Sequence, residues 1–156
     1  RRVLFRSFRR TIREGEQFAV HYHDYSCVMG ATVSGTLKLS EDSRGLYFVL
    51  DVPDTSLGKD IHTLVSRGDI SHMSFSFRVN GSGGEEWREL SDGMIERRLL
   101  DVDLFEISPV AKPAYLDTQV TAGTLITGNR SIDLPPQARR NLMLRRHMQA
   151  RLNMIA

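Results

Sequence analysis

Several features that mark common protein classes are missing from this sequence. Its 156 residues include a single cysteine, Cys27, which excludes an internal disulfide framework and a cysteine-based zinc cluster. It has no apolar run of about 18 residues, the length that a membrane-spanning helix requires. The glycine-rich loops of nucleotide-binding proteins, the HExxH motif of zinc proteases and the GxSxG motif of α/β-hydrolases are also absent. The corresponding chemistries therefore lack their usual signatures.

What the sequence does contain is enough apolar material for one domain. Hydrophobic residues make up 40% of the chain and charged residues 26%, which is typical of a globular protein. A chain of this length can bury a core without the help of disulfides. The formal net charge of +2 is too small to indicate a nucleic-acid partner, and we consider one unlikely.

The two ends of the chain differ from its middle. From Arg130 onward six arginines stand against one aspartate, a local balance of +5, and helix-forming residues surround them. We therefore predict a basic C-terminal helical tail over residues 129–156. The chain begins without methionine or a signal-peptide pattern, and we take residues 1–16 as a truncated or non-native N-terminal segment. Residues 17–128 remain as the main domain.

Periodicity in this middle part predicts strands far more often than helices. Alternating apolar residues and turn residues indicate a hairpin over residues 35–53, a strand from His72 to Val79, and further strands around residues 87–90 and 94–105. One helix begins at an Asp54–Thr55 cap and ends at Gly68. Pro109 and Pro113 bracket a stretch that we predict to be irregular. The fold class is thus mainly β with a few helices (α+β), arranged as a sandwich or a barrel.

Three groups of residues could carry chemistry. His21 and His23 lie two positions apart, a spacing that would let them share a strand face and hold a metal, or let His23 serve as a base. Ser74 and Ser76 lie on the polar face of the 72–79 strand, where core residues on the other face would hold a nucleophile rigidly. Asp101, Asp103 and Glu106 form an acidic cluster, any member of which could orient a histidine. For each group an ordinary structural or solvated role is the competing interpretation.

Several sequence blocks, taken in order, resemble the prohead maturation proteases of tailed phages of the HK97 type. The blocks are Ser34–Leu39, Asp42–Leu46, Val52–Thr55, Arg67–Ser71, Met73–Phe75 and Ile107–Tyr115. The resemblance covers roughly residues 17–120. It implies a serine endopeptidase and a closed or partly open antiparallel β-barrel ringed by helices, similar to that of the herpesvirus assembly proteases.

The resemblance also implies roles for particular residues. The serine of the Met-Ser-Phe block, Ser74, would be the nucleophile, and the histidine before the Gly-Thr-Leu strand, His23, would be the base. The third member would be Glu106, with Asp101, Asp103 and His72 as alternatives. Relatives often have glycine where this chain has His72 and Ser76, and a basic residue where it has Ala31. These departures bear on the substrate groove and on activity.

The implied substrates are phage capsid and scaffold proteins, cut in the host cytoplasm inside the assembling prohead. We expect no cofactor, no resident metal and no membrane contact. Self-cleavage and a homo-oligomer are left open by the sequence. The basic tail is either a solvated surface helix or a tether for an acidic scaffold protein. The alternative function is a catalytically inactive β-barrel module that assists capsid assembly.

Overall fold

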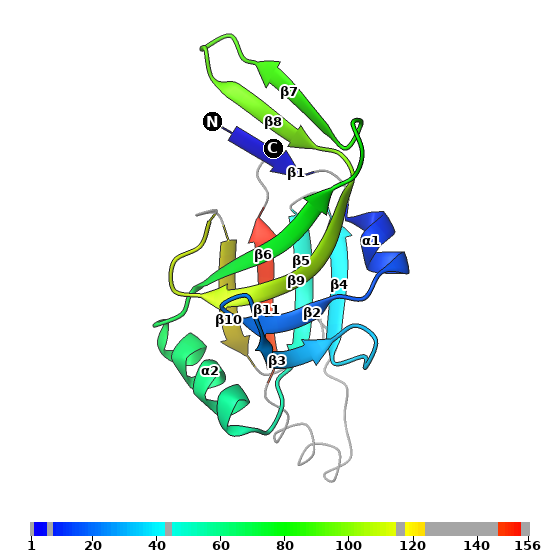
Figure 1. The fold of residues 1–156 in the computed structure, drawn as a ribbon. Coiled ribbons are helices and arrows are strands. Elements are labelled where there is room, and N and C mark those ends of the chain that lie inside the picture. The colour runs from blue at the N-terminus through cyan, green and yellow to red at the C-terminus, as the bar shows by residue number, and fades with distance from the viewer. Residues whose placement is uncertain (1, 6–7, 43–44, 115–117, 124–146, 154–156) are drawn as a thin grey trace, which may run out of the picture.

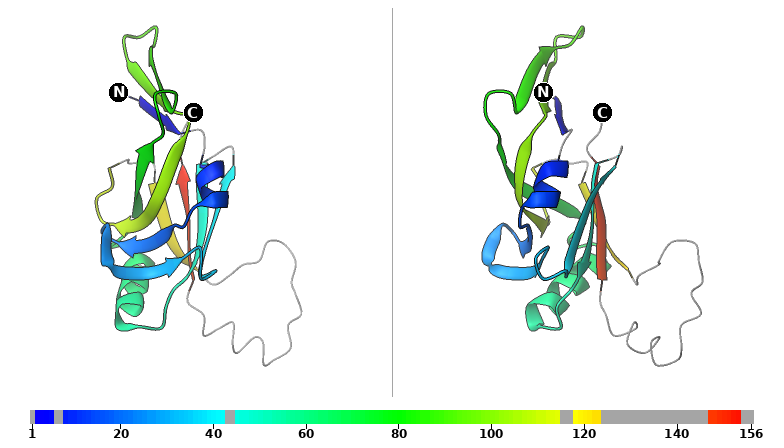
Figure 2. Two further views of the ribbon diagram at one scale, coloured as in Figure 1. Left: turned by 45° about the vertical axis from the view of Figure 1, so that its right-hand side comes forward. Right: turned by 90° about the vertical axis from the view of Figure 1, so that its right-hand side faces the viewer.

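Two four-stranded sheets pack face to face and enclose the core (Figures 1 and 2). This computed structural model describes residues 2–5, 8–42, 45–114, 118–123 and 147–153. The first sheet has the order β3-β2-β9-β6, and its strands are β2 (Phe18–His21), β3 (Asp24–Ala31), β6 (His72–Val79) and β9 (Val102–Val110). The second has the order β10-β11-β5-β4, with β4 (Leu37–Asp42), β5 (Gly45–Asp51), β10 (Thr118–Gly123) and β11 (His147–Asn153).

A smaller three-stranded sheet extends from one end of this body (Figure 1). It consists of β1 (Arg2–Phe5), β7 (Glu85–Glu89) and β8 (Ile95–Leu99), in the order β1-β8-β7. The β7–β8 hairpin projects away from the two packed sheets in all three views (Figures 1 and 2). Trp87 and Ile95 are exposed on it, whereas Leu99 at its base is fully buried.

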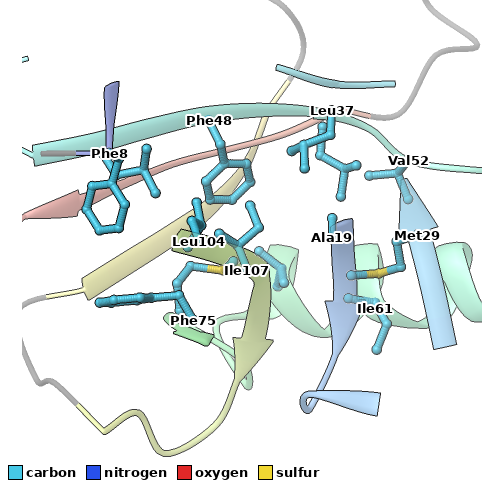
Figure 3. Close-up of a cluster of buried hydrophobic side chains, with 14 of the residues drawn as sticks. Phe8, Ala19, Met29, Leu37, Phe48, Val52, Ile61, Phe75, Leu104 and Ile107 are labelled. Carbon is cyan, nitrogen blue, oxygen red and sulfur yellow. The ribbon is translucent and has the colours of Figure 1, made fainter. Parts of the chain in front are cut away.

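Apolar side chains of the two large sheets meet in the middle of the body (Figure 3). Leu37 and Phe48 of the second sheet face Leu104 and Ile107 of the first, and all four are buried. Phe8 closes the cluster from the N-terminal side and packs edge-on against Phe75, with ring centroids 6.1 Å apart. This contact places Phe75 on the core-facing side of β6. Because side chains alternate along a strand, the neighbouring polar residues of β6 lie on the opposite face of the sheet.

Two helices are present in the described part of the chain. Helix α1 (Arg9–Glu14) precedes β2, and helix α2 (Ser56–Arg67) connects β5 to β6 at one end of the body (Figure 1). The Thr55 side chain accepts a hydrogen bond from the Gly58 N–H, and Gly68 ends α2 with a left-handed φ of 84°, which confirms the predicted helix. Neither helix has the length and apolar character needed to cross a membrane.

The mainly β class is confirmed, but a closed barrel is not seen. None of the three sheets formed by the described strands closes on itself, so the predicted barrel and its likeness to herpesvirus proteases are not confirmed. The hairpin over residues 35–53 is confirmed as β4 and β5, which pair from Leu37–Leu50 to Asp42–Gly45. The strand from His72 to Val79 is confirmed as β6.

Strand β9 corrects the prediction of an irregular stretch around Pro109. It runs on to Val110, and Pro109 pairs with Met73 of β6 inside it. Proline is tolerated in a strand where its missing N–H is not needed by a neighbouring strand. Strand β2 pairs with β9 only at Glu106 and Ile107, so Pro109 lies beyond the segment that β2 covers.

The predicted C-terminal helix is wrong for residues 147–153. This segment is strand β11, which pairs with both β5 and β10. Residue-level helix preference is a weak tendency, and pairing between two strands overrides it. The remainder of the predicted tail, residues 129–146 and 154–156, lies outside the described residues.

Candidate active site

The outer face of strands β6 and β9 carries a row of polar side chains. In the antiparallel pairing Ser74 lies opposite Ser108, and Ser76 lies opposite Glu106. Side chains directly opposite each other point to the same face, with Cβ atoms about 5 Å apart. Ser108 and Glu106 have no exposed surface and Ser74 is 5% exposed. This polar row is therefore covered rather than solvated.

A β-bulge at Phe105 brings Glu106 onto this face. Ser76 pairs with Glu106 but the next residue, Phe77, pairs with Leu104, so Phe105 has no partner in β6. Val102 and Leu104 face the core before the bulge, and Ile107 does so after it. If Phe105 were accommodated by regular alternation instead of a bulge, Glu106 would point into the core with Leu104. Bulges commonly redirect a side chain in this way near functional sites.

A tight turn between β2 and β3 covers the polar row. His21 pairs with Asp24, and the two residues between them, Tyr22 and His23, both have left-handed backbones with φ of 51° and 62°. Turns of this shape favour asparagine and glycine, and a larger residue in this conformation costs about 1–2 kcal/mol. Two contacts hold the turn, one with β9 and one with the residue that follows it. The Tyr22 hydroxyl accepts the Ala111 N–H at 3.0 Å, and Ser108 Oγ accepts the His23 N–H at 3.0 Å.

The structure brings two of the predicted site residues, His23 and Glu106, into direct contact. His23 Nδ1 lies 2.6 Å from Glu106 Oε1, and the His23 side chain is 43% exposed while that of Glu106 is 1% exposed. A carboxylate buried to this degree requires partners for its charge. If Nδ1 carries the proton in this contact, Nε2 of the neutral ring is left with the lone pair that a base needs.

Ser74 and His23 are neighbours of the same residue. Ser74 pairs with Ser108 across the sheet, and Ser108 accepts the backbone N–H of His23. The polar row thus groups Ser74, His23 and Glu106 around Ser108, although they come from three different segments. A hydroxyl, an imidazole and a carboxylate gathered in this way are the components of a serine nucleophile and its base.

Ser76, the other candidate nucleophile, has a different partner. Its side chain shares a hydrogen bond with the hydroxyl of Tyr25 on β3, and Tyr25 packs edge-on against Phe18 at a centroid distance of 6.0 Å. Burial, with a smaller contribution from the negative charge of Glu106, raises the pKa of Tyr25, and the bond to Ser76 opposes this shift. Tyr25 therefore stays neutral beside Glu106.

His21 does not join His23 in a metal site of the kind that their spacing allowed. His21 ends β2 whereas His23 lies in the turn, so the two do not share a strand face. The His21 ring bonds to the Pro109 backbone, and burial lowers its pKa. No described residue hydrogen-bonds to its buried Nδ1. Within the described ranges no three histidine, cysteine or acidic side chains are grouped as a metal would require.

The alternative third members lie among other partners. Asp101 and Asp103 both accept hydrogen bonds from Arg10 of α1, and Asp103 also accepts them from Arg78 and Asn80. His72 is opposite Val110, and its Nδ1 lies 3.1 Å from Ser71 Oγ. Of the acidic cluster and His72, Glu106 is the member that the structure places against His23.

Sequence reasoning missed two residues of this neighbourhood, Ser108 and Tyr25. Ser108 was treated only as part of a sequence block, because the stretch that contains it was predicted to be irregular. The two-residue spacing from Glu106 to Ser108 is the signal that could have identified it, once the stretch is recognised as a strand. Tyr25 gives no such signal, since its neighbour Ser76 lies far away in the sequence.

Comparison with known proteins identifies the family of the chain. Searches of curated proteins and of solved structures return no significant match. A family model described as caudovirus prohead serine protease matches residues 2–131, which include Ser74, His23 and Glu106. Because that match spans most of the 156 residues, the chain belongs to the caudovirus prohead serine protease family, a family of serine peptidases.

Proposed function

We propose that this chain is a serine endopeptidase in which Ser74 is the nucleophile, His23 the general base and Glu106 the carboxylate that orients the base. The observation that carries the proposal is the 2.6 Å contact between His23 Nδ1 and the buried carboxylate of Glu106. Its support comes from the pairing of Ser74 with Ser108, next to the His23 backbone. Family membership supports the reaction class.

The reaction follows from the chemistry of these three groups. His23 Nε2 accepts the proton of the Ser74 hydroxyl while Ser74 Oγ forms a bond to the carbonyl carbon of the substrate peptide. His23 then gives the proton to the departing amine as the carbon–nitrogen bond breaks, and water releases the acyl group by the same steps. Glu106 stabilises the positive imidazolium that forms in between, and its burial strengthens this effect.

The proposed substrates are capsid and scaffold proteins of a phage head during maturation. This proposal rests on the family, whose printed description is a prohead serine protease. It carries with it the proposed location in the assembling prohead inside the host cell. A structural relationship to the herpesvirus assembly proteases is a further proposal, carried only by the sequence resemblance.

A fluorophosphonate probe tests the nucleophile without knowledge of the cleavage sequence. Ser74 Oγ would bond to phosphorus and displace fluoride, with His23 accepting the hydroxyl proton. We expect labelling to map to Ser74 and to disappear in Ser74→Ala, whereas the matched variant Ser76→Ala keeps labelling and folds equally well. Labelling retained in Ser74→Ala but lost in Ser76→Ala would move the nucleophile by two residues. A folded wild-type protein that neither reacts nor cleaves capsid protein would favour the inactive assembly module.

A further inference from the structure

We propose that Ser108 is a positioning residue that locks the Glu106 carboxylate and the His23 backbone to one another. The inference rests on the proposed function, because it concerns how the base and its carboxylate are held. Ser108 itself touches neither the reacting hydroxyl proton nor the scissile bond in this scheme. Its effect would be exerted through Glu106 and His23.

The Ser108 hydroxyl is used in both of its hydrogen-bonding roles. It donates its proton to Glu106 Oε2 at 2.5 Å and accepts the His23 N–H at 3.0 Å. Glu106 Oε1 meets His23 Nδ1 at 2.6 Å, so each oxygen of the carboxylate has its own partner. A serine hydroxyl offers one proton and two lone pairs, which suits it to this bridging position.

The geometry forms a closed circuit from His23 back to His23. The ring of His23 contacts one oxygen of Glu106, the other oxygen contacts Ser108, and Ser108 contacts the His23 backbone. Rotation of the carboxylate would break the Ser108 bond, and a shift of the turn would break the His23 N–H bond. The circuit therefore fixes the distance and the angle between the base and its carboxylate.

Burial makes these bonds hard to replace by water. Ser108 and Glu106 have no exposed surface, so a lost donor would leave a buried oxygen without a partner. The turn adds a second reason, because His23 has a left-handed backbone that needs to be held in place. The same position also lies opposite Ser74, so the residue that fixes the base is next to the proposed nucleophile.

An ordinary core hydrogen bond is the competing explanation, and the pH dependence separates the two. Glu106 is faced by His23 from the turn, Ser108 from its own strand, Ser76 from β6 and Tyr25 from β3. Loss of the Ser108 donor would concentrate negative charge on the oxygen that meets His23. Protonation of the pair would then occur at higher pH, and the acid limb of the reaction rate would move upward. A purely structural bond would lower stability without moving that limb.

The test compares Ser108→Ala with the rescue variant Ser108→Thr and with Thr11→Val. Thr11 is a matched control because its hydroxyl is buried and bonds to β9 at Leu104, away from His23. The readout is the rate of fluorophosphonate labelling from about pH 5 to pH 9, with melting temperatures measured in parallel. A second readout is the NMR signal of the His23 Nδ1 proton, which needs no catalytic activity.

We expect Ser108→Ala to label about tenfold to a hundredfold more slowly, by analogy with the loss seen when the hydrogen-bond partner of a metal-binding histidine or carboxylate is removed. Its acid limb should rise by about half a pH unit, and Ser108→Thr should restore both values. Thr11→Val should have a lower melting temperature, but the acid limb of its labelling rate should stay at the wild-type pH. The inference would be overturned if Ser108→Ala labelled at the wild-type rate with the wild-type acid limb. It would also be overturned if Thr11→Val moved the acid limb as far as Ser108→Ala does. In either case the proposed function would stand. If wild type does not label, an unchanged His23 signal in Ser108→Ala would still overturn it.

Discussion

The side chain on which the site depends most is Glu106, a carboxylate with no exposed surface. Among the described residues, the hydrogen bonds to this carboxylate come from His23 and Ser108. A buried carboxylate of this kind is costly to keep without a function. In the proposed mechanism His23 takes up the hydroxyl proton and forms an ion pair with Glu106, which stabilises the protonated ring.

Glu106→Gln should therefore slow fluorophosphonate labelling by about a hundredfold to ten-thousandfold at neutral pH, because the amide keeps the shape but not the charge. Glu96→Gln is a suitable control, since Glu96 is 7% exposed and lies on β8 in the small sheet. Labelling rates and melting temperatures of both variants give the comparison. Equal slowing in the two variants would mean that the loss reflects general destabilisation rather than the proposed role of Glu106.

At the scale of strands, the bulge at Phe105 is the feature that creates the polar row. Strand β9 reverses its inward face between Leu104 and Ile107, and this reversal places Glu106 beside Ser76. A strand shifted by one residue moves every later side chain to the opposite face. The site thus depends on the bulged backbone at Phe105 as much as on the identity of its polar residues.

Deletion of Phe105 should keep labelling within about tenfold of wild type, because removal of the unpaired residue leaves Glu106 opposite Ser76 and Ile107 opposite Phe75 in regular alternation. Phe105→Thr keeps the inserted residue and removes a side chain that is 38% exposed, so it should label within about twofold of wild type. Labelling kinetics and circular dichroism follow both variants. A folded deletion variant that no longer labels would contradict this expectation and show that the extra residue itself is needed to hold Glu106 in place.

The sequence predicted β4, β5, β6 and most of β9, which are half of the eight strands in the two large sheets. The β4–β5 hairpin, helix α2 and strand β6 follow from alternation and caps that act within a few residues. The alternation of core-facing residues in β9 was predicted correctly as far as Leu104. The bulge at Phe105, after which Ile107 instead of Glu106 faces the core, was not predicted. A bulge has no sequence mark of its own here, since Phe105 resembles any other strand residue.

Long-range pairing accounts for the other errors. Strand β11 was predicted as helix because its partners, β5 and β10, are distant in sequence and only their pairing favours an extended chain. The candidates Ser74, His23 and Glu106 were identified through the family resemblance, whereas the residues alone left Ser76 and the two aspartates open. The structure gives these candidates different partners in space, and those partners support the proposed roles.

For the whole molecule, helix α1 is attached to the body by both apolar and polar contacts. Phe8 enters the core and Thr11 bonds to the backbone of Leu104, in the strand that carries Glu106. Next to them Arg10 lies 2.5 Å from Asp103, which is also bonded to Arg78 of β6 and to Asn80. The hydrogen bonds of Asp103 therefore connect helix α1 to strands β6 and β9 of the first sheet.

Asp103 makes this connection dependent on pH. Hydrogen bonds from Asn80 and Arg10 hold the pKa of its carboxyl at about 2, below its ordinary value of 3.8. Because the pKa is lower in the folded state, the stabilisation is complete above about pH 4 and is lost as the pH falls toward 2. The Asp103 side chain is 21% exposed, so screening by solvent reduces the expected contribution to about 1 kcal/mol.

We therefore expect Asp103→Asn to lower the free energy of unfolding by about 1 kcal/mol at neutral pH, with a difference from wild type that narrows as the pH falls from about 4 toward 2. Urea unfolding followed by circular dichroism measures that difference at each pH. Asp54→Asn is the matched control, since the Asp54 side chain is 85% exposed and pairs with Lys59 on the surface, and it should stay close to wild type throughout. A difference for Asp103→Asn that is the same at pH 3 as at pH 7 would mean that its carboxylate charge does not hold helix α1 against the sheet. A difference that narrows as expected would connect the docking of α1 to the charge of β9, three residues before Glu106.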